Sequence, residues 1–190
     1  MKIGLFFGSF NPIHFGHMAI ANYVAEYTEI KQIWFVISPQ NPFKLRSSLL
    51  ADYHRYELVS RAIGDDPRFK ASTIEFKLPK PSYTIDTLTY LSEQYPDKKF
   101  YLIIGSDQLP YFPKWKNYEL LMENYNFLVY PRPGTDKHVL MEHSAFQRIE
   151  APMMEISSTF IRSGIKEEKD LRYFMPQAAW EYLREMHFYE

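Results

Sequence analysis

The chain has 190 residues, 46% of them hydrophobic and 24% charged, which is ordinary for a soluble α/β protein with a substantial core. Its 22 Lys and Arg against 23 Asp and Glu give a formal net charge of −1, so the basic surplus that duplex binding needs is missing and no nucleic-acid partner is expected. The absence of cysteine excludes disulfides, thiolate zinc sites and cysteine nucleophiles, and it fits a cytoplasmic protein without a membrane span.

Apolar runs alternate along the chain with segments of helical periodicity. Strands are expected at residues 3–7, 32–38, 70–76, 100–104, 127–130 and 153–156. Helices are expected at residues 14–27, 49–63, 84–95, 118–123, 158–163 and 176–186. This alternation predicts an α/β fold with a mostly parallel central sheet and helices on both faces. We expect one domain over residues 1–190, with a helical segment of about 158–188 packing on it.

Unusual polar sequence follows several of the expected strands. The four segments are Gly8-Ser9-Phe10, Ser38-Pro39-Gln40, Gly105-Ser106-Asp107 and Ile156-Ser157-Ser158. Ligands of open parallel sheets bind beyond the carboxyl ends of the strands, so these segments are expected to form one site. The loops 39–50, 106–117 and 131–152 are candidates for its substrate-specific parts.

The first of these loops matches neither the three-glycine dinucleotide fingerprint nor the Gly-Lys-Ser/Thr ending of the P-loop. Its two histidines, His14 and His17, lie one helical turn apart at the start of a helix, where free N–H groups attract anions. The pattern therefore favours a phosphate site. Two other interpretations are that the histidines cap the helix or lie on the surface, and that they bind a metal, although no third ligand is evident nearby.

The stretch from Gly8 to His17 resembles the H-x-G-H signature of the nucleotidyltransferase superfamily, which implies a Rossmann-like nucleotidyltransferase fold that binds ATP. Residues 156–162, ISSTFIR, resemble the second signature of that superfamily. Ser157, Ser158 and Thr159 supply hydroxyls and helix-start N–H groups, and Arg162 supplies a planar fork for phosphate oxygens. Alone, the serine cluster is more typical of a helix N-cap.

Three further segments, 81–87 (PSYTIDT), 104–107 (IGSD) and 113–115 (PKW), occur in the order seen in bacterial nicotinate-nucleotide adenylyltransferases. His54-Arg55 and Arg132-Pro133-Gly134 also match positions of this family. The resemblance spans nearly the whole chain. It implies transfer of AMP from ATP to nicotinate mononucleotide, giving deamido-NAD and pyrophosphate, in NAD biosynthesis. Mg²⁺ would accompany ATP, held by phosphate oxygens and water rather than by a protein metal site.

The resemblance assigns three groups of residues. The ATP site would contain Gly8, Ser9, Phe10, His14, His17, Gly105, Asp107, Ile156, Ser157, Ser158 and Arg162. The pyridine nucleotide would be received by Thr84, Trp115 and Lys116, with the Trp115 ring stacked on nicotinate and main-chain N–H groups on its carboxylate. Charge on the reacting phosphates would be stabilised by His14, His17, Lys44 and Arg162. Two positions depart from the family pattern: Phe43 replaces a histidine, and Lys116 replaces a tyrosine.

Several points stay open in the sequence. It does not give the oligomeric state, so a homo-oligomer is an open alternative, nor the strictness of nicotinate over nicotinamide, nor loop closure on substrate, nor the contacts of residues 41–44. The nearest alternative enzymes are phosphopantetheine adenylyltransferases and cytidylyltransferases. A non-catalytic nucleotide-binding module on the same fold is the alternative from another class.

Overall fold

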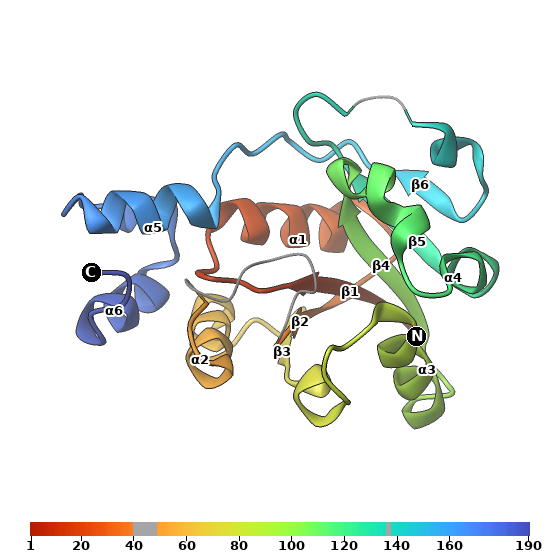
Figure 1. Ribbon diagram of the computed structural model, residues 1–190, viewed down its shortest axis with the longest axis horizontal. Helices are drawn as coiled ribbons and strands as arrows, with labels where there is room; N and C mark the ends of the chain where they lie inside the picture. The colour runs from red at the N-terminus through yellow and green to blue at the C-terminus, as the bar shows by residue number, and fades with distance from the viewer. Residues whose placement is uncertain (40–48, 136–137) are drawn as a thin grey trace.

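The computed structural model describes residues 1–39, 49–135 and 138–190, and it contains a six-stranded sheet in the order β3-β2-β1-β4-β5-β6 (Figure 1). The strands are β1 Lys2–Gly8, β2 Gln32–Ile37, β3 Phe69–Ser72, β4 Lys99–Gly105, β5 Asn126–Tyr130 and β6 Phe146–Arg148. Every neighbouring pair is parallel. This order is that of a doubly wound Rossmann-like sheet, and it confirms the expected fold class.

Six α-helices accompany these strands in the described parts of the chain. They are α1 Phe15–Tyr27, α2 Asp52–Ile63, α3 Thr84–Gln94, α4 Tyr118–Asn124, α5 Ser158–Lys166 and α6 Gln177–Glu185. No helix among the described residues is long and apolar enough to span a bilayer.

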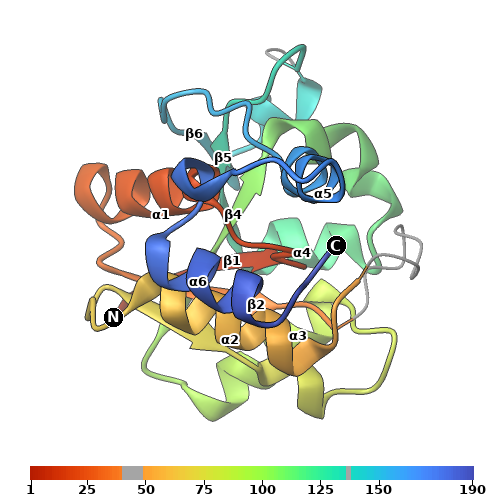
Figure 2. The same ribbon diagram turned by 90° about the vertical axis from the view of Figure 1, so that its left-hand side faces the viewer.

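Alternate strand residues enter two separate cores, as the period-two geometry of a strand requires. In β1, Ile3 and Leu5 lie in one core, which α3 and α4 cover, and Phe6 lies in the other, which contains residues of α1, α2, α5 and α6. Helices therefore pack on both faces of the sheet. Helix α6 lies beside α2 (Figure 2). This shared packing favours the expected single domain, which stays a prediction.

The structure corrects three expectations about local structure. The strand expected at 153–156 is wrong, because these residues have no regular structure, and the sixth strand is β6, inside the expected loop 131–152. Of its three residues only Phe146 is buried, so β6 lacks the apolar run that marks a strand in sequence. The expected strand 70–76 stops at Ser72, and Ile74–Lys77 form a 3₁₀ turn, η2.

The third correction concerns residues 106–117, expected as a loop. Most of this segment is a 3₁₀ helix, η3, which runs from Ser106 to Lys114. It contains Pro110 and Pro113, which lack the N–H of an ordinary helical residue. Prolines at these positions argue against a helix, so the sequence did not predict η3.

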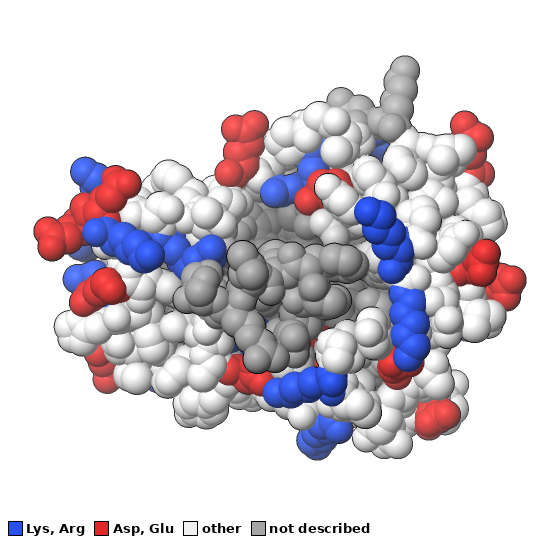
Figure 3. Space-filling view, viewed as in Figure 1, with Lys and Arg blue, Asp and Glu red and all other residues white. Residues whose placement is uncertain are grey.

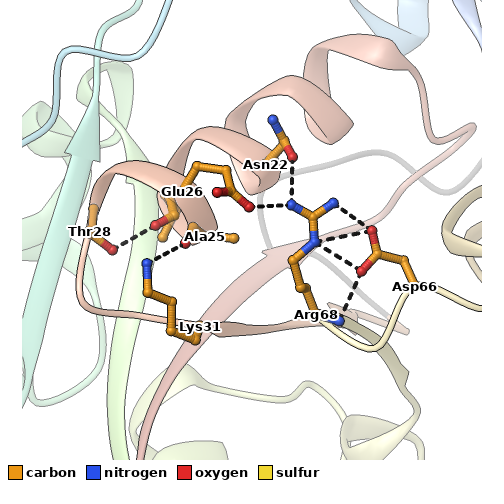
Figure 4. A network of polar contacts seen from close by, with 8 residues as sticks. Asn22, Ala25, Glu26, Thr28, Lys31, Asp66 and Arg68 are labelled. Atoms are coloured by element: carbon orange, nitrogen blue, oxygen red, sulfur yellow. Dashed lines mark hydrogen bonds and ion pairs between the residues drawn. The ribbon is translucent and has the colours of Figure 1, made fainter.

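A polar network far from the carboxyl ends of the strands holds α1 against the chain that enters β3 (Figure 4). The guanidinium of Arg68 donates from Nη1 to Asn22 Oδ1 at 3.0 Å and to Glu26 Oε1 at 2.5 Å, both on α1. Its Nη2 donates to Asp66 Oδ2 at 2.6 Å. These ion-pairing side chains are partly exposed, so solvent screens the pairs and each contributes little to the stability of the fold.

Candidate active site

The first segment of the site lies beyond β1, next to β4, where the strand order reverses its direction. Phe10 has a left-handed backbone with φ of 44°, and the peptide Asn11-Pro12 is cis. The Phe10 ring is buried, with its centroid 5.1 Å from that of His17 and 5.5 Å from that of Phe35. Its side chain therefore belongs to the core, and only its main chain is available to a nucleotide.

The two histidines of the first motif contact each other directly. The main-chain N–H of His14 donates to His17 Nδ1 at 3.3 Å. The two imidazole rings are stacked, with centroids 3.7 Å apart and planes 29° apart. Because His17 Nδ1 accepts a hydrogen bond, a neutral His17 ring carries its proton on Nε2, and that nitrogen is then a donor.

His14 is nearly fully buried, and burial lowers its pKa from 6.5 to about 4, with a smaller contribution from Arg132. Its imidazole is therefore neutral at neutral pH in the free protein. Gly16 makes this packing possible, since a Cβ there would lie 2.9 Å from His14 Nδ1. Because Gly16 has no side chain, the His14 ring can pack against the start of α1.

The second motif reaches the first through two side chains of α5, Ser158 and Arg162, while Ser157 caps the helix. Ser157 Oγ accepts the main-chain N–H of Phe160 at 3.1 Å, so this hydroxyl does act as an N-cap. Ser158 Oγ donates to the carbonyl of Pro12 at 2.8 Å, and Arg162 Nη1 donates to the carbonyl of Asn11 at 2.7 Å. The structure therefore joins the two motifs at one place, although 146 and 151 positions separate these partners.

The end of β4 adds Gly105 and Asp107. A Cβ on Gly105 would collide with Asp107 Oδ1 and lie 3.1 Å from Arg132 Cγ, so the glycine makes room for both side chains. Burial, together with the nearby Asp107 carboxylate, raises the pKa of Tyr130 to about 12. The phenol of Tyr130 therefore stays protonated beside the carboxylate.

Arg132 is a further cation of this site, and no role was assigned to it from sequence. Its main-chain N–H donates to Ser106 Oγ at 2.8 Å, and its Nη1 donates to the carbonyl of Met154 at 3.2 Å. The charge of Arg132 lowers the pKa of His14, which places the guanidinium near residues 8–14, the loop that is predicted to bind phosphate and is called the phosphate loop hereafter. The family match at residues 132–134 was the available signal for it.

A second group of predicted residues gathers where α3 begins. Thr84 is the first residue of α3. Lys116 Nζ donates to both oxygens of Asp86, in the first turn of α3, at 3.0 and 2.8 Å. Trp115 is half-buried and contacts Phe112 at a ring-centroid distance of 5.2 Å, with the two ring planes 41° apart. The structure therefore brings Thr84, Trp115 and Lys116 together, and the Lys116 ammonium is already engaged by α3.

Glu75 lies buried beneath this second group and was missed from sequence. Its Oε1 accepts the hydroxyl of Thr87, on α3, at 2.8 Å. Burial raises the pKa of Glu75, and the hydroxyls of Ser38, Thr87 and Ser82 partly oppose that shift. The carboxyl thus links the end of β2 to the start of α3.

Replacing Glu75 with glutamine is expected to flatten the dependence of stability on pH. Between the ordinary pKa of 4.5 and the raised pKa in the fold, the folded state holds more protons than the unfolded chain, so the free energy of unfolding falls as pH rises. Glu75→Gln removes that loss, and its stability relative to wild type should grow above pH 4.5. Urea unfolding from pH 4 to 8 measures it, and a difference constant with pH would contradict the assignment.

Arg55 is a fully buried cation that holds the ends of β1 and β2 together. Its Nη1 donates to the carbonyls of Ser9 and Ser38 at 2.9 Å each, and its Nε donates to the carbonyl of Leu50 at 2.9 Å. Its Nη2 pairs with Asp52 at 2.5 Å. The family match at Arg55 is thereby explained as support for the phosphate loop. The predicted Lys44, with residues 40–43, lies outside the described residues.

Figure 3 shows Lys and Arg side chains spread around the middle of the face that it draws, with Asp and Glu side chains among them. In residues 1–39, 49–135 and 138–190, no three His, Asp or Glu side chains gather closely enough to hold a metal ion.

Comparison with known proteins identifies the family. The Cytidylyltransferase-like family model matches residues 5–164. A Cytophaga hutchinsonii protein named "Probable nicotinate-nucleotide adenylyltransferase" is 50% identical over 189 residues, covering 100% of this chain and 98% of its own length.

The fold is also that of two solved structures of Plasmodium falciparum nicotinic acid mononucleotide adenylyltransferase. The one complexed with NaAD has a TM-score of 0.83 at 22% identity, over 99% of this chain and 97% of its own. The one complexed with APC has a TM-score of 0.81 at 21% identity, over 99% and 96%. The chain belongs to the cytidylyltransferase-like superfamily and, within it, to the nicotinate-nucleotide adenylyltransferase family.

Proposed function

We propose that this chain transfers AMP from ATP to nicotinate mononucleotide, giving deamido-NAD and pyrophosphate for NAD biosynthesis. One observation carries the proposal. The two motifs with helix N-termini and cationic side chains meet at Asn11 and Pro12, while a separate group with a half-buried tryptophan lies at the start of α3. The site thus offers one place for phosphates and a neighbouring place for a flat ring. The names of the relatives agree with this acceptor.

ATP would bind with its phosphates between the N-termini of α1 and α5. His17 Nε2, the Arg162 guanidinium and the free N–H groups of both helices are donors suited to phosphate oxygens. Main-chain atoms of Gly8, Ser9 and Phe10 would approach the nucleotide from β1. Gly105 and Asp107 at the end of β4 would lie near its adenosine.

The reaction we propose is an in-line attack of the 5′-phosphate of nicotinate mononucleotide on the α-phosphorus of ATP, with pyrophosphate leaving. The attacking oxygen is already anionic, so neither a general base nor a protein nucleophile is needed. Catalysis would then depend on positioning and on donors aimed at the developing charge. A neutral His14 fits this role as a hydrogen-bond donor. Mg²⁺ would enter as part of the ATP substrate, held by phosphate oxygens and water.

Replacing Trp115 with alanine is expected to raise the KM for nicotinate mononucleotide at least about fivefold, because one aromatic stack contributes about 1–3 kcal/mol. The KM for ATP should change less than about twofold. Steady-state kinetics with each substrate varied in turn measures both constants. Tyr111→Ala, which removes an exposed ring from η3, the helix that ends just before Trp115, is the control. Equal effects of Trp115→Ala on both KM values would argue against stacking.

Pyrophosphate release with three acceptors tests the proposal. The acceptors are nicotinate mononucleotide, nicotinamide mononucleotide and phosphopantetheine, each supplied with ATP and Mg²⁺. Release should be fastest with nicotinate mononucleotide. Preference for phosphopantetheine would favour that related activity, and ATP binding without release in any mixture would favour the non-catalytic module. Cytoplasmic location stays a prediction, and a homo-oligomer stays an open alternative.

A further inference from the structure

Residues 186–190 leave α6 and return to the phosphate loop (Figure 2). Main-chain hydrogen bonds close the turn, from Met186 to the carbonyl of Tyr182 and from Phe188 to that of Leu183 at 3.1 Å each, and from His187 to that of Arg184 at 3.2 Å. His187 and Tyr189 have left-handed backbones, with φ of 53° and 68°. Non-glycine residues keep such conformations where surrounding contacts over-determine them. This segment is therefore held in place by specific contacts.

The contact at the end of this segment is with Asn11 of the phosphate loop. Tyr189 Oη donates to Asn11 Oδ1 at 2.6 Å, and the same oxygen accepts the main-chain N–H of Leu50 at 3.1 Å. The carbonyl of Asn11 accepts Arg162 Nη1 at 2.7 Å. Asn11 is only 4% exposed, so one buried residue joins the first motif, the second motif and the end of the chain.

The phenol of Tyr189 is suited to donating a supporting hydrogen bond and not to carrying a charge. Burial raises the pKa of Tyr189 well above its ordinary value, although Arg162 and Arg55 oppose the shift. The hydroxyl therefore keeps its proton and donates at any pH used in an assay. A neutral donor can lie beside the Arg162 guanidinium without neutralising the charge that a phosphate would meet.

We propose that Tyr189 is a positioning residue for adenylyl transfer, which acts through the Asn11 side chain on the turn that carries the ATP-binding histidines. The inference rests on the proposed function of the same site. Asn11 precedes Pro12 and His14, and its carbonyl is the present partner of Arg162. Releasing its side chain would let this turn and the guanidinium shift together, without removing any group that touches ATP.

The chain contains a matched control for this hydroxyl. Tyr182 lies on α6, and its hydroxyl bonds His54 Nδ1, on α2, at 2.9 Å. Tyr182→Phe and Tyr189→Phe each remove one oxygen that ties the end of the chain to the rest of the fold. Only the partner of Tyr189 lies in the phosphate loop. A purely structural role predicts similar results from the two variants.

Steady-state kinetics and thermal melting of both variants test the proposal. Tyr189→Phe should lower kcat/KM for ATP about 5–20-fold, the range expected when one hydrogen bond that orders a site is lost. The KM for nicotinate mononucleotide should change less than about twofold. Tyr182→Phe should leave both constants within about twofold of wild type. Unchanged kinetics in Tyr189→Phe, or equal losses in the two variants, would overturn the proposal.

A double-mutant cycle with Asn11→Leu tests the route of the effect. If Tyr189 acts through Asn11, the double variant should lose no more kcat/KM for ATP than Asn11→Leu alone. Multiplicative losses would contradict that route.

Calorimetric titration with ATP separates this inference from the proposed adenylyl transfer. If wild type releases no pyrophosphate, the proposed function fails, and weaker ATP binding by Tyr189→Phe than by Tyr182→Phe still supports the positioning role; equal binding overturns it.

Discussion

His17→Ala is expected to lower kcat about 10²–10³-fold, with a melting temperature within a few degrees of wild type. The loss is the usual cost of removing one donor aimed at charge that develops in a transition state. The ring is fixed by the hydrogen bond from the His14 N–H and by stacking on the His14 imidazole, so its Nε2–H direction is set before ATP arrives. Rapid-quench or steady-state turnover measures the effect.

Two further substitutions of His17 make this prediction sharper. A glutamine places its amide nitrogen near the position of Nε2, whereas an asparagine places it near Nδ1. Because Nδ1 accepts a hydrogen bond from the protein, His17→Gln should retain more turnover than His17→Asn. Near-normal kcat in folded His17→Ala, or the reverse order of the two amides, would contradict the assigned role.

Arg162→Ala is expected to lower kcat/KM for ATP about 10³-fold, because the guanidinium is the cation that α5 brings to the phosphate loop. Arg162→Lys should recover only part of this loss, since an ammonium keeps the charge but lacks the planar fork. Steady-state kinetics with ATP varied measures the constant, and thermal melting reports the cost of losing the bond to Asn11.

Two control variants separate the effect of the Arg162 charge from the effect of the bond that attaches α5 to the phosphate loop. Ser158→Ala removes the other bond between α5 and the phosphate loop, at Pro12, and leaves the charge in place. Arg172→Ala removes an exposed arginine paired with Asp170 beyond α5. The loss in Arg162→Ala should exceed that in either control by at least about tenfold. If Ser158→Ala loses as much kcat/KM for ATP as Arg162→Ala, then Arg162 only attaches α5 to the phosphate loop.

The central strands could be predicted because β1, β2 and β4 are buried on both faces and therefore appear as continuous apolar runs. The edge strand β6 could not, because two of its three side chains are exposed. Residues 153–156 resemble a strand in sequence but form no regular structure. Register and edges depend on tertiary contacts that local sequence does not record.

In the site, too, local sequence predicts some residues and tertiary contacts determine the others. His14 and His17 were predictable because one helical turn and one loop place them, and the second motif is equally local. The supporting residues were not. Tyr189 meets Asn11 across 178 positions, and Glu75 is turned inward by a 3₁₀ turn that reads as a strand. A buried polar side chain with a distant partner leaves no local pattern.

The most direct test of the central claim is product identification by mass spectrometry after incubation with ATP, Mg²⁺ and nicotinate mononucleotide. Attack on the α-phosphorus predicts deamido-NAD and pyrophosphate in equal amounts, with neither ADP nor AMP accumulating, and His17→Ala should form both products far more slowly. Release of ADP or AMP, or ATP consumption without a dinucleotide, would contradict adenylyl transfer at this site.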